Sequence, residues 1–235
     1  MFKKKRKKHS VARRLIFKEN PKSIIAEQFR TIRTNINFSM PDRNFKTILV
    51  TSAGPGEGKS TTSANIVGVY AQEGKRMLLV DADMRKPTIH YTFKLANSKG
   101  LSGVLTRQYA LNDAIQKTDI EGLYVLPSGA IPPNPAELLG TKRMNQLLID
   151  LQDQFDLIVF DTPPILSVTD SQILSNKCDA TILVVNSRQT AKETAAKARD
   201  ILAQSKANLI GVILNNFVLE KNHYYYYQYY GNANN

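Results

Sequence analysis

The sequence predicts an α/β fold with a mostly parallel β-sheet and helices on both of its faces. Short runs rich in Val, Ile and Leu alternate along the chain with longer amphipathic stretches. These runs are apolar throughout, which is typical of parallel strands buried on both faces. A glycine-rich loop follows the first run and aspartates close two later runs, so chemically useful residues gather where strands end.

Six of the apolar runs have the length of strands and span residues 47–51, 77–81, 123–126, 157–161, 180–185 and 209–214. The amphipathic stretches predict helices over residues 24–37, 60–73, 141–154, 170–176 and 190–205. Three prolines stiffen residues 131–135 into a loop that leads to a helix. Strands that alternate with helices indicate a parallel sheet.

The net charge of +12 is concentrated at the start of the chain. Residues 1–18 contain nine Lys and Arg and no acid, so the rest carries only +3. Tyr and Asn dominate residues 221–235. The sequence therefore predicts a flexible basic tail over residues 1–18, one folded domain over 19–220 and a flexible tyrosine-rich tail over 221–235. Because the folded part lacks a strong basic excess, we expect no specific nucleic-acid partner.

Composition excludes several protein classes. Apolar residues make up 42% and charged residues 22% of the chain, which fits a globular protein and excludes global disorder and collagen. The sequence contains no run of about 18 apolar residues, so it predicts no membrane span. Cys178 is the single cysteine, which excludes an intrachain disulfide framework. The basic start lacks the apolar stretch of a secretory signal, so we expect a reducing, cytosolic setting.

The strongest motif is the loop AGPGEGKST at residues 53–61, between the first strand and the next helix, which is the context of a phosphate-binding loop. Glycines let backbone N–H groups turn toward phosphate oxygens, and the following helix N-terminus attracts anions. A chance glycine-rich turn is the alternative, and Ala53 stands where the consensus has Gly. The residues predicted to bind nucleotide here are Gly54, Pro55, Gly56, Glu57, Gly58, Lys59, Ser60 and Thr61.

Three aspartates are predicted to gather at the same edge of the sheet as this loop. Asp81 and Asp83 follow one strand and Asp161 closes another, and ligands bind at the carboxyl ends of parallel strands. A single aspartate at a strand end is usually a turn former, but three behind a phosphate loop favour a metal and phosphate site. Arg85 lies close in sequence and either pairs with an acid or contacts phosphate.

The motifs resemble the bacterial tyrosine kinase family, the cytoplasmic kinases of capsular and exopolysaccharide loci in Gram-positive bacteria. The resemblance covers about residues 19–230 and is carried by SAGPGEGKST (52–61), LLVDADMRKP (78–87), IPPNPAELL (131–139), LIVFDTPP (157–164) and the C-terminal tyrosines. It implies a deviant-Walker P-loop NTPase fold, unrelated to eukaryotic protein kinases, with ATP and Mg²⁺ as ligands.

The resemblance also assigns roles to single residues. Lys59 would hold phosphates, and Ser60, Asp83 and Asp161 would hold Mg²⁺ directly or through water. Asp81 would be the base, or the orienting group, for the incoming tyrosine hydroxyl. The remaining positions are Asn215 and Asn216, which correspond to the adenine side of the site.

A further motif concerns assembly. Glu27, Arg30 and Arg33 lie three residues apart and would follow one helix face. A row of salt bridges within the helix is one explanation. The resemblance instead implies that these residues join subunits into a ring-like homo-oligomer. It also implies a separate membrane-spanning activator, other protein substrates, a cognate phosphatase, and a place at the inner face of the membrane through that activator.

Six tyrosines crowd the C-terminal tail: Tyr224, Tyr225, Tyr226, Tyr227, Tyr229 and Tyr230. The resemblance makes them phosphoacceptors, and we expect phosphorylation in trans, with the tail of one subunit entering a neighbouring site. An edge strand or an aromatic patch is an alternative. Stacking on nucleic-acid bases is another, although residues 222–235 contain no Lys or Arg that such binding usually needs.

Alternative functions remain open. The chain could be a deviant-Walker ATPase switch of the partitioning and septum-positioning type, but those proteins carry an additional lysine early in the phosphate loop, where this chain has Ala53 and Gly54. It could also be a nucleotide-gated scaffold for polysaccharide export. The basic residues 3–8 could bind anionic lipid or nucleic acid, or simply be solvated.

Overall fold

A computed structural model describes residues 13–40 and 45–218 of the chain. In this part seven strands form one sheet in the order β3-β4-β2-β5-β1-β6-β7. Every neighbouring pair is parallel except the antiparallel pair β3–β4. The strands are β1 (Thr47–Ser52), β2 (Met77–Asp81), β3 (Gln116–Lys117), β4 (Leu123–Leu126), β5 (Leu157–Asp161), β6 (Ala180–Asn186) and β7 (Leu209–Asn215). The predicted mostly parallel sheet is confirmed.

The described residues form ten helices, and the five predicted ones are all present. These five are α2 (Ile24–Ser39), α3 (Lys59–Ala71), α8 (Lys142–Gln152), α9 (Asp170–Ser175) and α10 (Lys192–Gln204). The sequence did not predict the others, which are α1 (Ile16–Glu19), α4 (Ile89–Phe93), α5 (Leu101–Leu105), α6 (Leu111–Ala114) and α7 (Pro135–Gly140). Each of these has only four to six residues, so its helical period is weak in the sequence.

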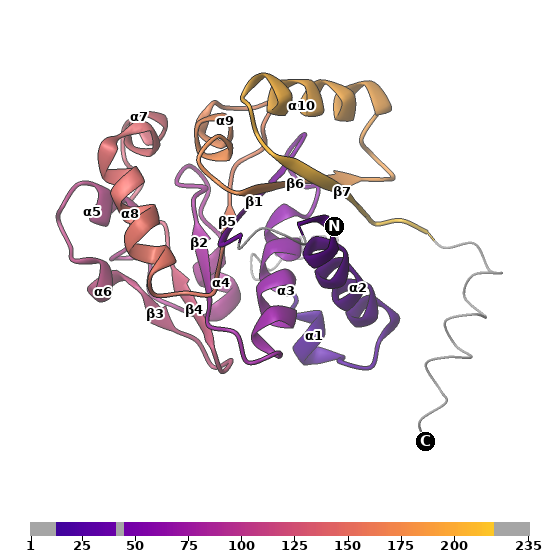
Figure 1. The fold of residues 1–235 in the computed structure, drawn as a ribbon, viewed down its shortest axis with the longest axis horizontal. Coiled ribbons are helices and arrows are strands. Elements are labelled where there is room, and N and C mark those ends of the chain that lie inside the picture. The colour runs from indigo at the N-terminus through magenta and orange to yellow at the C-terminus, as the bar shows by residue number, and fades with distance from the viewer. Residues whose placement is uncertain (1–12, 41–44, 219–235) are drawn as a thin grey trace, which may run out of the picture.

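Helices cover both faces of the sheet (Figure 1). On one face, Ile48 and Val50 of β1 pack in a core with α2 and α3. On the other face, Leu49 packs in a second core with α5, α8 and α9, and a third small core joins α10 to β6. Successive strand residues point to opposite faces. Because both faces are buried, the strands read as continuous apolar runs.

The chain before α2 is part of the fold, which corrects the predicted domain start at residue 19. Phe17 is buried against Gly68 of α3, where an added Cβ would overlap its ring. The backbone N–H of Ile16 donates to Asn65 Oδ1 at 2.7 Å, and that of Arg13 donates to Thr92 Oγ1 at 3.0 Å. The apolar Leu-Ile-Phe run at residues 15–17, inside a basic segment, was the signal for this docking.

Residues 1–12 and 219–235 lie outside the described residues, and so do all six predicted phosphoacceptor tyrosines. The predicted flexibility therefore stays a prediction for residues 1–12 and 221–235, whereas residues 13–18 dock on the domain. Among the residues that the structure describes, no helix has the length and apolarity needed to cross a membrane.

Candidate phosphate-binding site

The phosphate loop, residues 53–61, connects β1 to the start of α3 at the carboxyl edge of the sheet. Gly58 precedes α3 with φ +94° and provides no side-chain cap, so the N–H groups of the first helical turn remain for an anion. A Cβ at Gly58 would also overlap the side-chain amide of Asn215, so only glycine fits here. Lys59, Ser60 and Thr61 form the first turn of α3, as the motif predicts.

Lys59 extends from this turn toward two of the predicted aspartates. Its Nζ lies 3.1 Å from Asp83 Oδ2 and 3.5 Å from Asp161 Oδ2. The Ser60 hydroxyl lies 3.2 Å from the same Nζ. Burial lowers the pKa of Lys59, but the carboxylates of Asp161 and Asp83 outweigh burial, so its pKa is raised. The Lys59 side chain is therefore positively charged at the centre of the site.

Asp161 closes β5 and is fully buried. Its Oδ1 accepts a hydrogen bond from Ser63 Oγ at 3.2 Å. Burial raises the pKa of Asp161, although the positive charge of Lys59 opposes this. Ser63 was not predicted as a site residue, but it is one helical turn after Lys59 in α3, and that spacing was a usable signal.

Asp81 closes β2 and lies directly beside Asp161 in the parallel register of β2 and β5. Its Oδ2 accepts hydrogen bonds from the backbone N–H groups of Thr88 and Ile89, each at 3.0 Å. Its Oδ1 is buried and has no hydrogen-bond partner in the described structure. Burial and the neighbouring Asp161 raise the pKa of Asp81 to about 8.

The donor set fits a magnesium ion that is shared with a phosphate. Ser60, Asp83 and Asp161 supply a hydroxyl and two carboxylates, the hard oxygen ligands that Mg²⁺ binds alongside substrate phosphates. In the part of the chain that the structure describes, no three His, Cys, Asp or Glu side chains converge into a complete metal cage. The predicted metal residues are thus brought together, with Lys59 between them.

The Glu57 side chain faces the interior of the protein, so its predicted place among the nucleotide-binding residues stays a prediction for its backbone N–H. Glu57 is only 5% exposed, and its Oε2 accepts a hydrogen bond from Ala53 N at 2.9 Å. Its Oε1 accepts a hydrogen bond from the hydroxyl of Thr190, in the loop between β6 and α10. Thr190 was not predicted, and no sequence signal links it to a residue 133 positions away.

Arg85 forms a salt bridge, the first of its two predicted alternatives. Its Nε and Nη2 donate to the two carboxylate oxygens of Asp170, each at 3.0 Å. The Asp170 carboxylate at the start of α9 is fully buried, while 41% of the Arg85 side chain is exposed. The pair joins the segment after β2 to α9, so this geometry does not support the prediction of Arg85 as a nucleotide ligand.

Asn215 forms a hydrogen bond with the phosphate loop, whereas Asn216 bonds to Arg188 instead. The Asn215 side chain donates to the backbone carbonyl of Glu57 at 2.8 Å. Asn216 contributes its backbone carbonyl to Arg188 Nε at 3.1 Å and has φ +57°. The end of β7 thus borders the loop through Asn215, and the adenine-side role of the two asparagines stays a prediction.

The three residues of the predicted interface motif on α2 do not act alike. Glu27 and Arg30 form an ion pair within the helix, and the Arg30 guanidinium also donates to Pro21 O. Arg33 instead turns inward, donating to Val69 O at 2.7 Å and pairing with Glu73 at 2.9 Å. It therefore fastens α2 to the last turn of α3. The prediction that these three residues join subunits stays a prediction, and within the monomer Arg33 is already engaged by α3 and Glu73.

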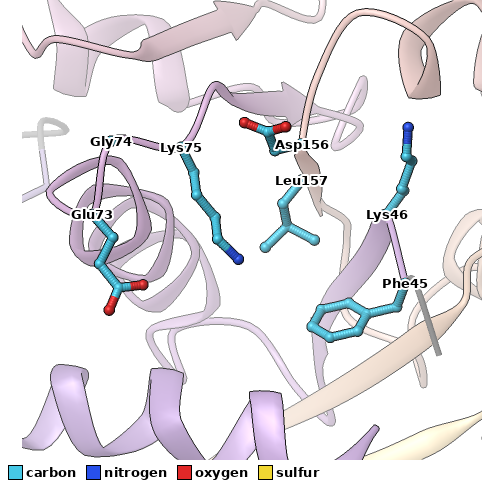
Figure 2. Close-up of a pocket in the computed structure, with 7 residues that line it drawn as sticks. All are labelled: Phe45, Lys46, Glu73, Gly74, Lys75, Asp156 and Leu157. Atoms are coloured by element: carbon cyan, nitrogen blue, oxygen red, sulfur yellow. The ribbon is translucent and has the colours of Figure 1, made fainter. Parts of the chain in front are cut away.

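A separate cavity of about 430 Å³ lies at the opposite edge of the sheet, near the starts of β1, β2 and β5. Figure 2 shows Lys75 and Phe45 extending into this space, with Leu157 between them and Lys46 pointing away. Lys46 donates to Gln152 O, and Asp156 accepts from Arg76 N at 2.7 Å. This cavity is remote from Lys59 and has no part in the phosphate site.

Comparisons with known proteins agree with this geometry. The AAA domain model matches residues 45–213. The chain is 50% identical to the tyrosine-protein kinase YwqD of Bacillus subtilis, over 95% of this chain and 93% of that protein. It is 41% identical to the putative tyrosine-protein kinase CapB of Staphylococcus aureus, over 95% and 98% respectively. The solved structure of the chimerical protein CapA2B2 has a TM-score of 0.84 and 43% identity, covering 88% of this chain and 93% of that chain.

The alternative ATPase class is structurally similar but distant in sequence. The septum site-determining protein MinD of Pyrococcus horikoshii has a TM-score of 0.64 at 24% identity, covering 75% of this chain and 72% of that chain. A likeness at this level of identity shows the common fold alone.

Proposed function

This chain belongs to the bacterial tyrosine-protein kinase family and to the AAA domain family, and from that membership we propose how its site transfers phosphate from ATP to tyrosine. One observation carries the proposal. Lys59, at the end of the phosphate loop, lies between Asp83 and Asp161. Beside them, Oδ1 of Asp81 has no hydrogen-bond partner in the described structure. Phosphoryl transfer with a loose transition state requires positioned cations and an oriented hydroxyl, and little else from the protein.

The residues of the site divide the work. The N–H groups of the phosphate loop and the first turn of α3 bind the phosphate oxygens, and Lys59 neutralises their charge. Ser60, Asp83 and Asp161 would hold Mg²⁺, which supplies further charge neutralisation when bound. Asp81 accepts or orients the proton of the incoming tyrosine hydroxyl through Oδ1, since Thr88 and Ile89 already occupy its Oδ2.

We propose that the acceptors are the six C-terminal tyrosines, modified in trans. The described chain ends at Val218, soon after Asn215 at the rim of the site, and the first of these tyrosines follows six residues later. In an oligomer, a tail tethered near a neighbouring site has a high effective concentration there. Other proteins phosphorylated on tyrosine would be substrates of the same site.

The oligomer is proposed to form through α2. Glu27 and Arg30 lie on its outer side, and two large apolar residues of the helix are exposed, Ile25 at 51% and Phe38 at 75%. Protein interfaces typically have an apolar core within a polar rim, so exposed large apolar residues on this helix favour an interface. Arg33 would support such an interface by holding α2 against α3.

The partners and setting of the kinase are part of the same proposal. The family resemblance supports a separate membrane-spanning activator, which would bring this chain to the inner face of the membrane, and a cognate phosphatase. Control of capsular or exopolysaccharide synthesis follows from the same resemblance. The basic residues 3–8 would add attraction to anionic lipid, about 1 kcal/mol per charge near the surface.

The first experiment counts phosphates by intact mass spectrometry after incubation with Mg·ATP, alone and with a cytoplasmic fragment of a candidate activator. Matched variants are Lys59→Met and a chain with Phe at all six tyrosines of residues 224–230. We expect several phosphate additions, absent from both variants. Hydrolysis of ATP without a change in protein mass, even with the activator, would instead support the ATPase switch.

A further inference from the structure

Glu57 belongs to the phosphate loop, yet both oxygens of its carboxylate accept hydrogen bonds from other groups of the protein. One oxygen accepts from Ala53 N, at the start of the same loop, and the other accepts from the Thr190 hydroxyl. The side chain therefore closes the loop on itself and fastens it to the segment between β6 and α10. Hydrogen bonds to a charged acceptor are the stronger kind, about twice as strong as neutral ones.

Asn215 fixes the backbone of the same residue. Its side-chain amide donates to Glu57 O at 2.8 Å and packs directly on Gly58. In a planar trans peptide the C=O and the following N–H point in opposite directions. Because Glu57 O points to Asn215, the N–H of Gly58 points away from Asn215. The orientation of one donor of the loop is therefore set from β7.

Thr190 and Asn215 are themselves held by the ends of β6 and β7. The N–H of Thr190 donates to Asn186 O at 2.9 Å, and the N–H of Ser187 donates to Asn215 O at 2.9 Å. Asn186 is buried, and its side chain bonds within the same loop, to Arg188 N and Gln189. Thr190 and Asn215, which contact the phosphate loop, are thus themselves held by hydrogen bonds at the ends of β6 and β7.

We propose that Thr190 and Asn215 are positioning residues that act through Glu57, holding the phosphate loop in its nucleotide-binding shape before nucleotide arrives. This arrangement, the Glu57 latch, consists of Glu57, Thr190 and Asn215. It rests on the proposed function only in requiring that the loop binds nucleotide. A loop already ordered in the free protein loses less entropy on binding, so its affinity is higher.

The sharpest variant is Thr190→Val, which keeps the shape of the side chain and removes the hydroxyl. We expect the Kd for Mg·ADP, measured by calorimetry on the full chain, to rise about tenfold, as for one lost hydrogen bond to a charged group. The KM for ATP should rise by a similar factor while kcat stays within about twofold, the pattern of lost uniform binding. Thr190→Ser, which keeps the hydroxyl that Thr190→Val removes, should bind Mg·ADP within about twofold of the original chain.

Two further variants test whether Thr190 acts through Glu57. Glu57→Ala should weaken Mg·ADP binding, and adding Thr190→Val to it should change the Kd no further. Glu57→Gln should bind almost normally, because its amide can accept from Ala53 N and donate to the Thr190 oxygen. If Glu57 acted chiefly as a repulsive charge, Glu57→Gln would instead bind Mg·ADP more tightly.

Thr106→Val is the matched control, because it removes a hydroxyl that donates to Ser102 O far from the loop. The latch is overturned if Thr190→Val lowers only the Tm of the free protein, or if Thr190→Ser binds Mg·ADP as weakly as Thr190→Val. It is also overturned if the increases in Kd caused by Glu57→Ala and Thr190→Val multiply in the double variant. The Kd for Mg·ADP and the Tm need nucleotide binding and folding, and not tyrosine transfer. A chain that binds Mg·ADP with a working latch but phosphorylates no tyrosine would therefore refute the proposed function alone.

Discussion

Asp81 has an environment that disfavours its own charge. Burial and the adjacent Asp161 raise its pKa from 3.8 to about 8, while the unfolded chain returns it to the ordinary value. Between these two values the folded protein holds a proton that the unfolded chain has released. The contribution of Asp81 to the free energy of unfolding therefore falls as the pH rises from about 4 to about 8.

The variant Asp81→Asn cannot ionise, so it escapes this penalty. Without metal or nucleotide, we expect its Tm to exceed that of the original chain at pH 8, and by at least about 4 °C more than at pH 5. Differential scanning calorimetry in EDTA at both pH values measures the two gaps. Equal gaps would mean that Asp81 is already ionised at pH 5 in the folded protein.

Docking of the N-terminal segment onto α3 depends on the absence of a side chain at Gly68. The Phe17 ring fills that space, so Gly68→Ala should destabilise the fold even though Ala is the better helix former by about 1 kcal/mol. Phe17→Ala should cost about 3 kcal/mol through the cavity it leaves. In the double variant the steric penalty of the added methyl group should vanish, which chemical denaturation of all four proteins measures. Additive losses would show that the two residues do not touch.

The two arginines of helix α2 make different contacts, Arg33 with the end of α3 and Arg30 with its own helix and the segment just before it. Arg33 pairs with Glu73 and caps a carbonyl of α3, so Arg33→Ala should lower the free energy of unfolding of the monomer by about 1–2 kcal/mol. Arg30 pairs with the exposed Glu27 and donates to Pro21 O at the surface, so Arg30→Ala should change it by less than about 1 kcal/mol. Urea denaturation at a concentration where each protein is monomeric makes the comparison. An equal cost for both would contradict the assignment of Arg33.

The elements that could be predicted from sequence are those long enough to repeat a pattern. The strands from β1 to β7 were found, apart from the two-residue β3, because burial on both faces leaves continuous apolar runs. The phosphate loop and its aspartates were found because chain order places them at strand ends. Thr190 and Asp170 were missed as partners, since their contacts with Glu57 and Arg85 exist only after distant segments meet.

At the scale of the whole molecule, phosphorylation changes the charge balance. Six phosphotyrosines would add about −9 to −12, comparable in size to the net charge of +12. Phosphate groups crowded near bound nucleotide should repel one another, so we expect the phosphorylated oligomer to dissociate. Light scattering after size-exclusion chromatography, before and after Mg·ATP and again after phosphatase treatment, follows the mass. A fully phosphorylated protein that keeps the oligomeric mass would refute this.

The position of Lys59 has a consequence for how the site is loaded. Without ligands, its ammonium group serves as the internal counter-ion of Asp83 and Asp161. A divalent cation arriving alone must displace that counter-ion, whereas a nucleotide phosphate offers the ammonium group a new partner. Loading is therefore an exchange of cations, in which nucleotide and metal each favour the entry of the other by the same factor. The site therefore favours the metal and nucleotide as a pair over the metal alone.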